Sequence, residues 1–350
     1  MMPRPKISVL IPTYNYARFL PEAIESVLAQ DLTDFELILS DDCSRDESAE
    51  IIRRYASQDS RIRAHLHPAN LGMVPNWNWC RQQARGEYLQ FLFGDDRFSS
   101  PQALGKMAAM LDQHASASMA VCARHVIDEH SEIFDFWDHL ETEGLHRGYD
   151  VGRRCLLQLQ NLIGEPSVVM LRADRLKRGF DPRYRQIVDL ELWCHVLQTG
   201  DLAYTKEPLC QFRRHARQQS EANSELQIGQ REYTLLFQHY LDYYLPPGTP
   251  FSFKDKQWLF TITYYLRKNK NLHAEAKAVG TVLLAKLDRK HYLGFWLLHR
   301  ITRPFKNLKR AWKKYVLSSP RSRTCEQVAV SAVAPRHPSA QSSSPPPPES

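Results

Sequence analysis

Apolar runs alternate with amphipathic segments through about the first 125 residues of this 350-residue chain. Short apolar-rich runs bounded by polar or turn residues predict buried strands. They fall at 7–11, 35–39, 62–66, 88–93 and 119–123. Between them, apolar residues recur at helical spacing within 19–29, 44–55, 75–84 and 101–111. This alternation predicts a parallel, doubly wound α/β sheet, in which ligands bind beyond the carboxyl ends of the strands.

The rest of the chain is less regular. Residues 125–185 are expected to cover the site and to help bind an acceptor, and a short helix at 189–198 and a strand at 202–215 follow. Helical patterns resume at about residue 226, and the Ser-, Pro- and Ala-rich end of the chain is too poor in apolar residues to fold. The predicted organisation is a main α/β domain at 1–220, a helical region at 221–317 and a disordered tail at 318–350.

Polar side chains directly follow three of the predicted strands. These tips are PTYN at 12–15, SDDCS at 40–44 and GDD at 94–96. Each can be an ordinary turn, and Ser44 and Glu47 have the spacing of a capping box. Carboxylates at a strand tip can also bind a base or ribose, or share Mg²⁺ or Mn²⁺ with substrate phosphates. Because parallel strand ends meet at one edge of a sheet, two acidic pairs there predict a site for a nucleotide and a divalent metal.

The same segments resemble the start of family 2 glycosyltransferases. The resemblance is dense from residue 6 to about 98 and thin from there to about 215. It rests on ISVLIPTYN at 7–15, AIESVLAQ at 23–30, FELI at 35–38, DDCSRD at 41–46, NLG at 70–72, ARGEY at 84–88 and the acidic pair at 95–96. The resemblance implies a GT-A fold, with a Rossmann-like, mostly parallel sheet flanked by helices. It also implies a nucleotide-sugar donor and an inverting transfer.

The resemblance assigns roles to individual residues at the strand tips. Pro12 and Tyr14 would line the nucleobase, and Asp42 would hold the nucleobase or the ribose. Asp95 would approach the ribose, and Asp96 would ligate the Mg²⁺ or Mn²⁺ ion that bridges the diphosphate.

An inverting transfer needs a general base close to the acceptor hydroxyl, and a carboxylate can serve. The segment VDLELW at 188–193 resembles the family's acidic pair before a helix, although Val188 stands where the family often has glutamate. The resemblance makes Asp189 the catalytic base. The alternative is that Asp189 only caps the helix, because aspartate is a favoured capping residue.

Two further segments qualify the resemblance. The segment FRRH at 212–215 resembles a late family segment near the diphosphate, where Arg213 and His215 would stabilise the charge of the leaving group. A solvated basic turn is the alternative for both residues. Cys43 stands where the family often has glycine, which bears on the geometry of that turn while the flanking acids remain.

Composition narrows the class of protein further. Hydrophobic residues make up 43% of the chain, enough for a sizeable core. No run approaches the ~18 apolar residues that a membrane-spanning helix needs. The seven cysteines are scattered without a CxxC pair, which favours a reducing compartment over a disulfide framework or a zinc site. The expected location is therefore the cytoplasm.

The net charge of +7 is concentrated in one segment. Residues 286–317 hold ten Lys or Arg against one Asp, so the first 285 residues are slightly acidic. This distribution argues against a nucleic-acid binder and for a local basic surface. From Pro304 the pattern is that of an amphipathic helix, which predicts peripheral contact with an anionic membrane at its inner face. Packing of the apolar face on the rest of the protein is the alternative.

The residues and the resemblance together predict an inverting, hexosyltransferase-like enzyme of cell-envelope polysaccharide synthesis. Its donor would be a nucleotide-diphosphate sugar, and its acceptor a hydroxyl of a glycan or lipid-linked molecule. A sugar nucleotidyltransferase would need a glycine-rich, basic loop after the first strand, and 12–18 contains no glycine. A catalytically inactive GT-A-like membrane adaptor is the other alternative, and the presence of Asp42, Asp96 and Asp189 argues against it.

Overall fold

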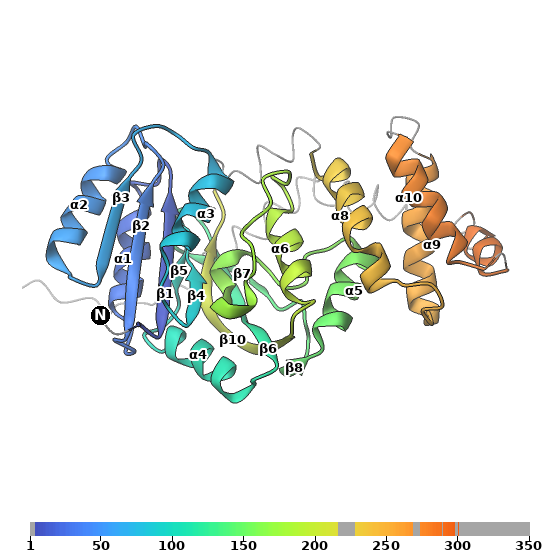
Figure 1. The fold of residues 1–350 in the computed structure, drawn as a ribbon, viewed down its shortest axis with the longest axis horizontal. Helices are drawn as coiled ribbons and strands as arrows, with labels where there is room; N and C mark the ends of the chain where they lie inside the picture. Colours follow the sequence, from blue (N-terminus) through green and yellow to red (C-terminus); the bar gives the residue numbers. More distant parts are fainter. Residues whose placement is uncertain (1–3, 216–227, 269–273, 289, 298–299, 301–350) are drawn as a thin grey trace, which may run out of the picture. The chain divides into compact units, whose positions relative to one another are not determined.

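The computed structural model describes residues 4–215, 228–268, 274–288, 290–297 and 300 (Figure 1). The chain forms two compact units, Met1–Lys286 and Leu287–Ser350. The expected domain limits at residues 220 and 317 fall outside the described residues, as do the amphipathic helix from Pro304 and the tail at 318–350. These stay predictions. In the described part of the chain, no helix is long and apolar enough to cross a lipid bilayer.

Four parallel strands form the first half of the sheet, in the spatial order β3-β2-β1-β4. They are β1 (Ile7–Thr13), β2 (Phe35–Asp41), β3 (Ile62–Leu66) and β4 (Tyr88–Phe91). The intervening helices are α1 (Leu20–Leu28), α2 (Ser48–Gln58) and α3 (Met73–Gln83). Every residue of β1 and β2 is buried, which is why both strands have apolar runs with little alternation. The α/β alternation predicted from the sequence is confirmed in this half.

The second half of the sheet is mixed. β9 (Val169–Arg172) lies between β4 and β6 (Ala117–Ile127) and is antiparallel to both. β10 (Asp201–Arg213) runs parallel to β6, and β5 (Arg97–Phe98) pairs antiparallel with β10. Two short strands extend this half: β7 (Ile133–Trp137) beside β6, and β8 (Gly144–His146) beside β10. The sequence pattern does not reveal β9, because its short apolar run lies in a stretch without a regular period.

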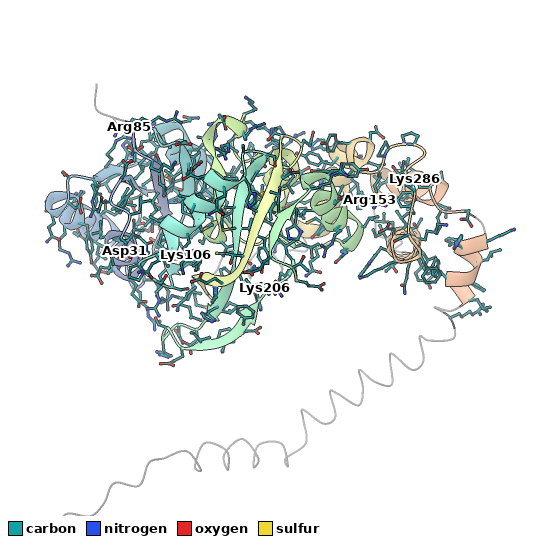
Figure 2. The ribbon with its side chains drawn as sticks, turned by 90° about the horizontal axis from the view of Figure 1, so that it is seen from below. Asp31, Arg85, Lys106, Arg153, Lys206 and Lys286 are labelled. Atoms are coloured by element: carbon teal, nitrogen blue, oxygen red, sulfur yellow. The ribbon has the colours of Figure 1, made fainter. Side chains whose placement is uncertain are left out.

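The remaining helices pack around this sheet and beyond it. They are α4 (Ala103–Gln113), α5 (Gly148–Gln158), α6 (Val188–Val196), α8 (Ile228–Tyr244), α9 (Phe253–Lys268) and α10 (Ala274–Ala285). α8 lies beside α6 (Figure 1), and the Tyr244 hydroxyl donates to the Cys194 carbonyl at 2.7 Å. α8 also crosses α5 so closely that a Cβ at Gly152 would lie 2.3 Å from the Tyr244 ring. Arg153 of α5, labelled in Figure 2, donates to Asp255 of α9 at 2.9 Å. These contacts join α8 and α9 to α5 and α6 within the first unit.

Candidate active site

A cavity of about 780 Å³ lies at the carboxyl ends of β1, β2 and β4. Its wall gathers residues that are far apart in the chain. Of the predicted site residues, it contains Pro12, Tyr14, Asp42, Asp95, Asp189 and His215. Asp96 and Arg213 do not line it. The parallel strand order explains the presence of Pro12, Tyr14, Asp42 and Asp95, because it brings the polar tips to one edge of the sheet.

Asp42 shapes one part of the wall by holding the backbone of a neighbouring loop. Its Oδ1 accepts the Leu71 N–H at 2.7 Å, and its Oδ2 accepts the Gly72 N–H at 2.9 Å. The Asn70 side chain donates to the Asp42 carbonyl at 2.9 Å. Gly72 has a φ of +90°, a conformation that a side chain would strain. Asp42 therefore fixes the 70–72 loop to the tip of β2, and Tyr14 lies exposed on the wall of the same cavity.

The turn at the tip of β2 has a left-handed backbone. Cys43 has a φ of +61°, so a cysteine occupies a conformation that glycine adopts without strain. Ser44 does not cap the following helix: α2 begins after Glu47, and the Ser44 hydroxyl oxygen accepts the Asn15 N–H at 2.8 Å. The capping box predicted for Ser44 and Glu47 is wrong, because the Ser44 hydroxyl instead joins the tips of β1 and β2.

Asp95 faces the cavity beside an imidazole. The Asp95 Oδ2 and His215 Nε2 atoms lie 3.2 Å apart, and each side chain is 7% exposed. Tyr16 lies on the same wall, where the charge of Asp95, together with burial, raises the pKa of its phenol well above the ordinary value. A carboxylate oxygen next to an imidazole nitrogen is a pair of donors that a divalent metal can share.

Asp96, which was expected to ligate the metal, lies behind the cavity wall. Its Oδ2 accepts the Ser167 hydroxyl at 2.5 Å, and its Oδ1 accepts the Arg213 backbone N–H at 2.9 Å. The residue is only 2% exposed. Burial, together with the charge of Asp95, raises the pKa of Asp96 well above the ordinary value. Of the two adjacent acids, Asp95 is the one that reaches the cavity.

Arg213, expected near the leaving group, has its guanidinium inside the protein. The residue is fully buried. Its guanidinium donates to the Asp95 carbonyl at 2.8 Å, and to the Asp128 carbonyl and the Glu22 carboxylate, each at 2.9 Å. These bonds connect β10 to the tip of β4, the end of β6 and α1. The structure thus places Arg213 where it supports the wall from behind.

Asp189 lines the cavity in the first turn of α6, which begins at Val188. Ile187 holds the N-cap position without a side-chain bond, so Asp189 is not the cap. Asn161 donates to its Oδ2 at 2.9 Å, and the Leu190 N–H donates to its Oδ1 at 2.7 Å. Although the side chain reaches the cavity, burial in the surrounding protein raises the pKa of Asp189 to about 7. A carboxylate that titrates near neutrality is suited to take up a proton at ordinary pH.

The sequence analysis did not identify several residues of the wall. They include Tyr16, Arg18, Trp77, Glu129 and Glu165. Tyr16 and Arg18 closely follow the PTYN tip, so their place in the sequence beside that tip could have identified them as wall residues. Glu129 and Glu165 come from the irregular 125–185 stretch, which has no pattern that singles them out. Arg18 Nη1 and Glu129 Oε2 lie 2.8 Å apart, and this ion pair links the loop after β1 to the turn after β6.

The donor set fits a metal only if the substrate helps to bind it. Within the described residues, no group of three or more His, Cys, Asp or Glu side chains is arranged to hold a metal ion. Asp95 and His215 supply two donors, and Mg²⁺ commonly combines one or two carboxylates with substrate phosphates and waters. The residues present therefore fit an ion shared between the protein and a diphosphate.

Comparison with known proteins agrees with this geometry. The model of Glycosyl transferase family 2 matches residues 8–179, which include the tips of β1, β2 and β4. EpsE of Bacillus subtilis (strain 168), provisionally described as a glycosyltransferase, is 37% identical over 216 residues, covering 57% of this chain and 69% of EpsE. TuaG of the same organism, provisionally described as a teichuronic acid biosynthesis glycosyltransferase, is 27% identical over 211 residues, covering 60% of this chain and 79% of TuaG.

Among solved structures, the crystal structure of S. aureus TarS 1–349 in complex with UDP-GlcNAc matches with a TM-score of 0.56. The match covers 84% of this chain and 91% of that chain at 16% identity, so it shows the shared fold alone. The family model and EpsE supply the similarity in sequence over the strands whose tips build the cavity. This chain therefore belongs to glycosyl transferase family 2 and is a glycosyltransferase with the GT-A fold.

Proposed function

We propose that the enzyme transfers a sugar, with inversion, from a nucleotide-diphosphate sugar to a hydroxyl of a glycan or lipid-linked acceptor. The observation that carries this proposal is the position of Asp189. Its carboxylate lines the same cavity as Asp42 and Asp95, and its pKa is raised to about 7, chiefly by burial. A base of this pKa is substantially ionised at neutral pH and can take the proton of the acceptor hydroxyl as that hydroxyl attacks.

A single base suffices for an inverting transfer, because the acceptor attacks the anomeric carbon from the face opposite the leaving diphosphate. Glu165 is a second carboxylate on the cavity wall, and its charge adds to the burial that raises the pKa of Asp189. The Oε2 atom of Glu165 lies 2.7 Å from Arg124 Nε, and this ion pair engages it. The hydrogen bonds that Asp189 accepts come from the Asn161 amide and the Leu190 N–H, which are neutral donors. We therefore assign Asp189, and not the ion-paired Glu165, as the base.

The donor nucleoside is assigned to the tips of β1 and β2. Pro12 and Tyr14 would contact the nucleobase, and Asp42 with the 70–72 loop would bind the base or the ribose. The hydrogen bonds that Asp42 accepts from the 70–72 loop support this assignment, because Asp42 and residues of this loop line the cavity. The UDP-GlcNAc bound by TarS makes uridine nucleotides the first donors to examine.

The diphosphate is assigned to the tip of β4. Asp95 and His215 would hold Mg²⁺ or Mn²⁺, which when bound neutralises the charge that develops on the leaving nucleoside diphosphate. The metal role that the resemblance gave to Asp96 passes to Asp95, because Asp96 lies behind the wall with both oxygens engaged. Asp96 and Arg213 would then keep Asp95 in place from the protein side.

The acceptor class follows from the relatives and not from a motif. The description of TuaG names teichuronic acid biosynthesis, which supports a role in cell-envelope polysaccharide synthesis for this chain as well. We place the enzyme in the cytoplasm, with peripheral membrane contact through 286–317. Such contact would keep the enzyme at the membrane surface, where a lipid-linked acceptor lies.

The proposed function can be tested with a panel of UDP-, GDP- and dTDP-sugars and the purified protein. We expect slow, acceptor-independent release of the nucleoside diphosphate from one class of donor, dependent on Mn²⁺ or Mg²⁺ and abolished by EDTA. Full activity in EDTA would remove the metal from the proposal. Pyrophosphate formed from a nucleoside triphosphate and a sugar phosphate would instead indicate a nucleotidyltransferase, and a protein that neither binds nor cleaves any donor would support the inactive adaptor.

The Asp42→Asn variant should weaken donor binding by about tenfold. An asparagine has one acceptor oxygen, so one of the two N–H groups now held by Asp42 would lose its partner, at a cost of ~1–3 kcal/mol. Calorimetric titration with the nucleoside diphosphate measures the effect. The matched control is Asp34→Asn, an exposed acid before the opposite end of β2, which should bind like the wild type. Equal affinity in both variants would contradict a role for Asp42 in the donor site.

A further inference from the structure

A carboxylate from α8 holds the loop that leads into α6. Glu232 is 3% exposed. Its Oε1 accepts the N–H of Arg185 at 2.7 Å, and its Oε2 accepts the N–H groups of Gln186 and Ile187 at 2.9 and 3.0 Å. Three backbone donors on one carboxylate make a strong, directional clamp, because each hydrogen bond is charge-assisted. Glu232 thus fixes the three residues that lead into α6, where Ile187 at the N-cap makes no side-chain bond of its own.

The clamped loop is part of the cavity wall. Arg185, Gln186 and Val188 line it, and Asp189 follows directly in the first turn of α6. The backbone just before the proposed base is therefore set by a residue of the helical region. The position of Asp189 relative to the acceptor hydroxyl depends on where this loop is held.

The next residue of α8 reaches the other segment that contacts Asp189. The Tyr233 hydroxyl donates to the Leu159 carbonyl at 2.9 Å. Asn161, two residues further on, donates to Asp189 Oδ2 at 2.9 Å. Burial, and after it the charge of Asp189, raises the pKa of the Tyr233 phenol. Two consecutive residues of α8 therefore brace the segments before and beside Asp189.

We propose that Glu232 is a positioning residue for Asp189, and that α8 acts on the proposed base through this residue. This inference rests on the proposed function, in which Asp189 is the general base. Glu232 acts through the backbone at 185–187 and does not itself touch substrate. Glu232 and its neighbour Tyr233 then give α8 a role in holding the proposed base in addition to its packing role.

The Glu232→Gln variant is the direct test. Its amide keeps the size of the side chain but offers one acceptor oxygen, and its NH₂ group would face a backbone N–H. We expect kcat for transfer to fall by about 10- to 100-fold, because an ångström-scale misplacement of a reacting group has effects of this size. The KM for the donor should stay within about twofold, because its assigned site on β1, β2 and β4 is not touched.

The pH profile separates positioning from a purely structural role. The titratable groups that act on or respond to Asp189 are Glu165, Cys155, Cys194 and Tyr233. Release of the loop admits water to the carboxylate and lowers its pKa toward the ordinary value. The acid limb of the kcat profile of Glu232→Gln should therefore move to lower pH. A loss of folded protein alone would lower the apparent kcat and leave both the KM and the limb in place.

The controls use the same helix. Asp242→Asn, an exposed acid of α8, should keep wild-type kcat. Glu232→Asp should recover part of the activity, because it restores two acceptor oxygens. If Glu232→Gln does not fold, Tyr233→Phe removes the bond to Leu159 and should lower kcat by a smaller factor, about threefold to tenfold.

A double-mutant cycle with Asp189→Asn tests separately whether Glu232 acts through Asp189 and whether Asp189 is the base. If Glu232 acts through Asp189, the double variant should be little slower than Asp189→Asn alone. Additive losses, or a Glu232→Gln enzyme with wild-type kcat, would overturn the positioning role while leaving the base intact. An Asp189→Asn enzyme with normal turnover would instead remove the proposed function on which this inference rests.

Discussion

Replacement of Asp189 by asparagine should lower turnover by roughly 10²- to 10⁴-fold while leaving donor affinity unchanged, because asparagine cannot accept the proton of the acceptor. In the wild type, kcat should rise with pH through an apparent pKa of about 7, since only the ionised carboxylate acts as base. This acid limb should be absent from whatever activity the variant retains. Steady-state transfer assays between pH 5 and 9, with donor binding measured separately, check both expectations.

Stability provides an independent readout for the same variant. The pKa of Asp189 is about 7 in the folded protein against an ordinary value of 3.8, so the folded state binds the extra proton between these values. Stability from this group is therefore fully present below about pH 4 and is lost as pH rises through 7. Asp189→Asn should accordingly be more stable than the wild type at pH 8. The control is Asp174→Asn, which replaces an exposed acid and should leave stability at pH 8 unchanged. A wild-type turnover for Asp189→Asn would leave Asp189 with a structural role only.

Replacement of Asp95 by asparagine should lower transfer by at least about 100-fold and weaken Mn²⁺ binding measured in the presence of the nucleoside diphosphate. Asparagine keeps the shape of the side chain and removes the charge that draws a cation to the wall. His215→Ala should weaken Mn²⁺ binding in the same way, because the two side chains lie 3.2 Å apart at their polar ends. Calorimetry or the electron paramagnetic resonance of bound Mn²⁺ gives the affinity without relying on activity.

The same replacement at Asp96, the acid next to Asp95, tests which of the two acids binds the metal. Asp96→Asn should retain most of its Mn²⁺ affinity, because Asp96 is buried behind the wall and its oxygens accept bonds from Ser167 and Arg213. Its expected effect is a modest loss of activity through a shift of Asp95. If Asp96→Asn abolishes Mn²⁺ binding and Asp95→Asn does not, the metal ligand is Asp96, as the resemblance alone implied.

The sequence predicted those features that depend on the order of residues within one segment. Parallel strands buried on both faces show little polar alternation, so β1, β2 and β4 could be read as runs of apolar residues with polar tips. Their carboxyl ends must share one edge of the sheet, which is why Asp42 and Asp95 could be expected in one cavity. The family resemblance rested on these strands and tips together with the segments 23–30, 70–72 and 84–88. It required no knowledge of side-chain direction.

Side-chain direction was decided only by the tertiary structure. Asp95 and Asp96 are neighbours in the chain with the same chemistry, yet one reaches the cavity and the other is buried. The difference comes from Ser167 and Arg213, which lie 71 and 117 residues away from Asp96. No local pattern encodes such partners.

The tertiary structure also decided what supports the base. The antiparallel strand β9 and the carboxylate of Glu232 come from stretches whose periodicity marks neither of them as special. Glu232 meets the 185–187 backbone only because α8 packs beside α6, 45 to 47 residues away in the chain. Sequence pattern determined the family, the alternation of strands and helices in the parallel half and the acids at its tips, because those depend on burial and spacing along one segment. Which acid reaches the cavity, which arginine is buried behind its wall and which helix holds the loop before Asp189 depend on packing between distant segments, and only the folded chain settles that packing.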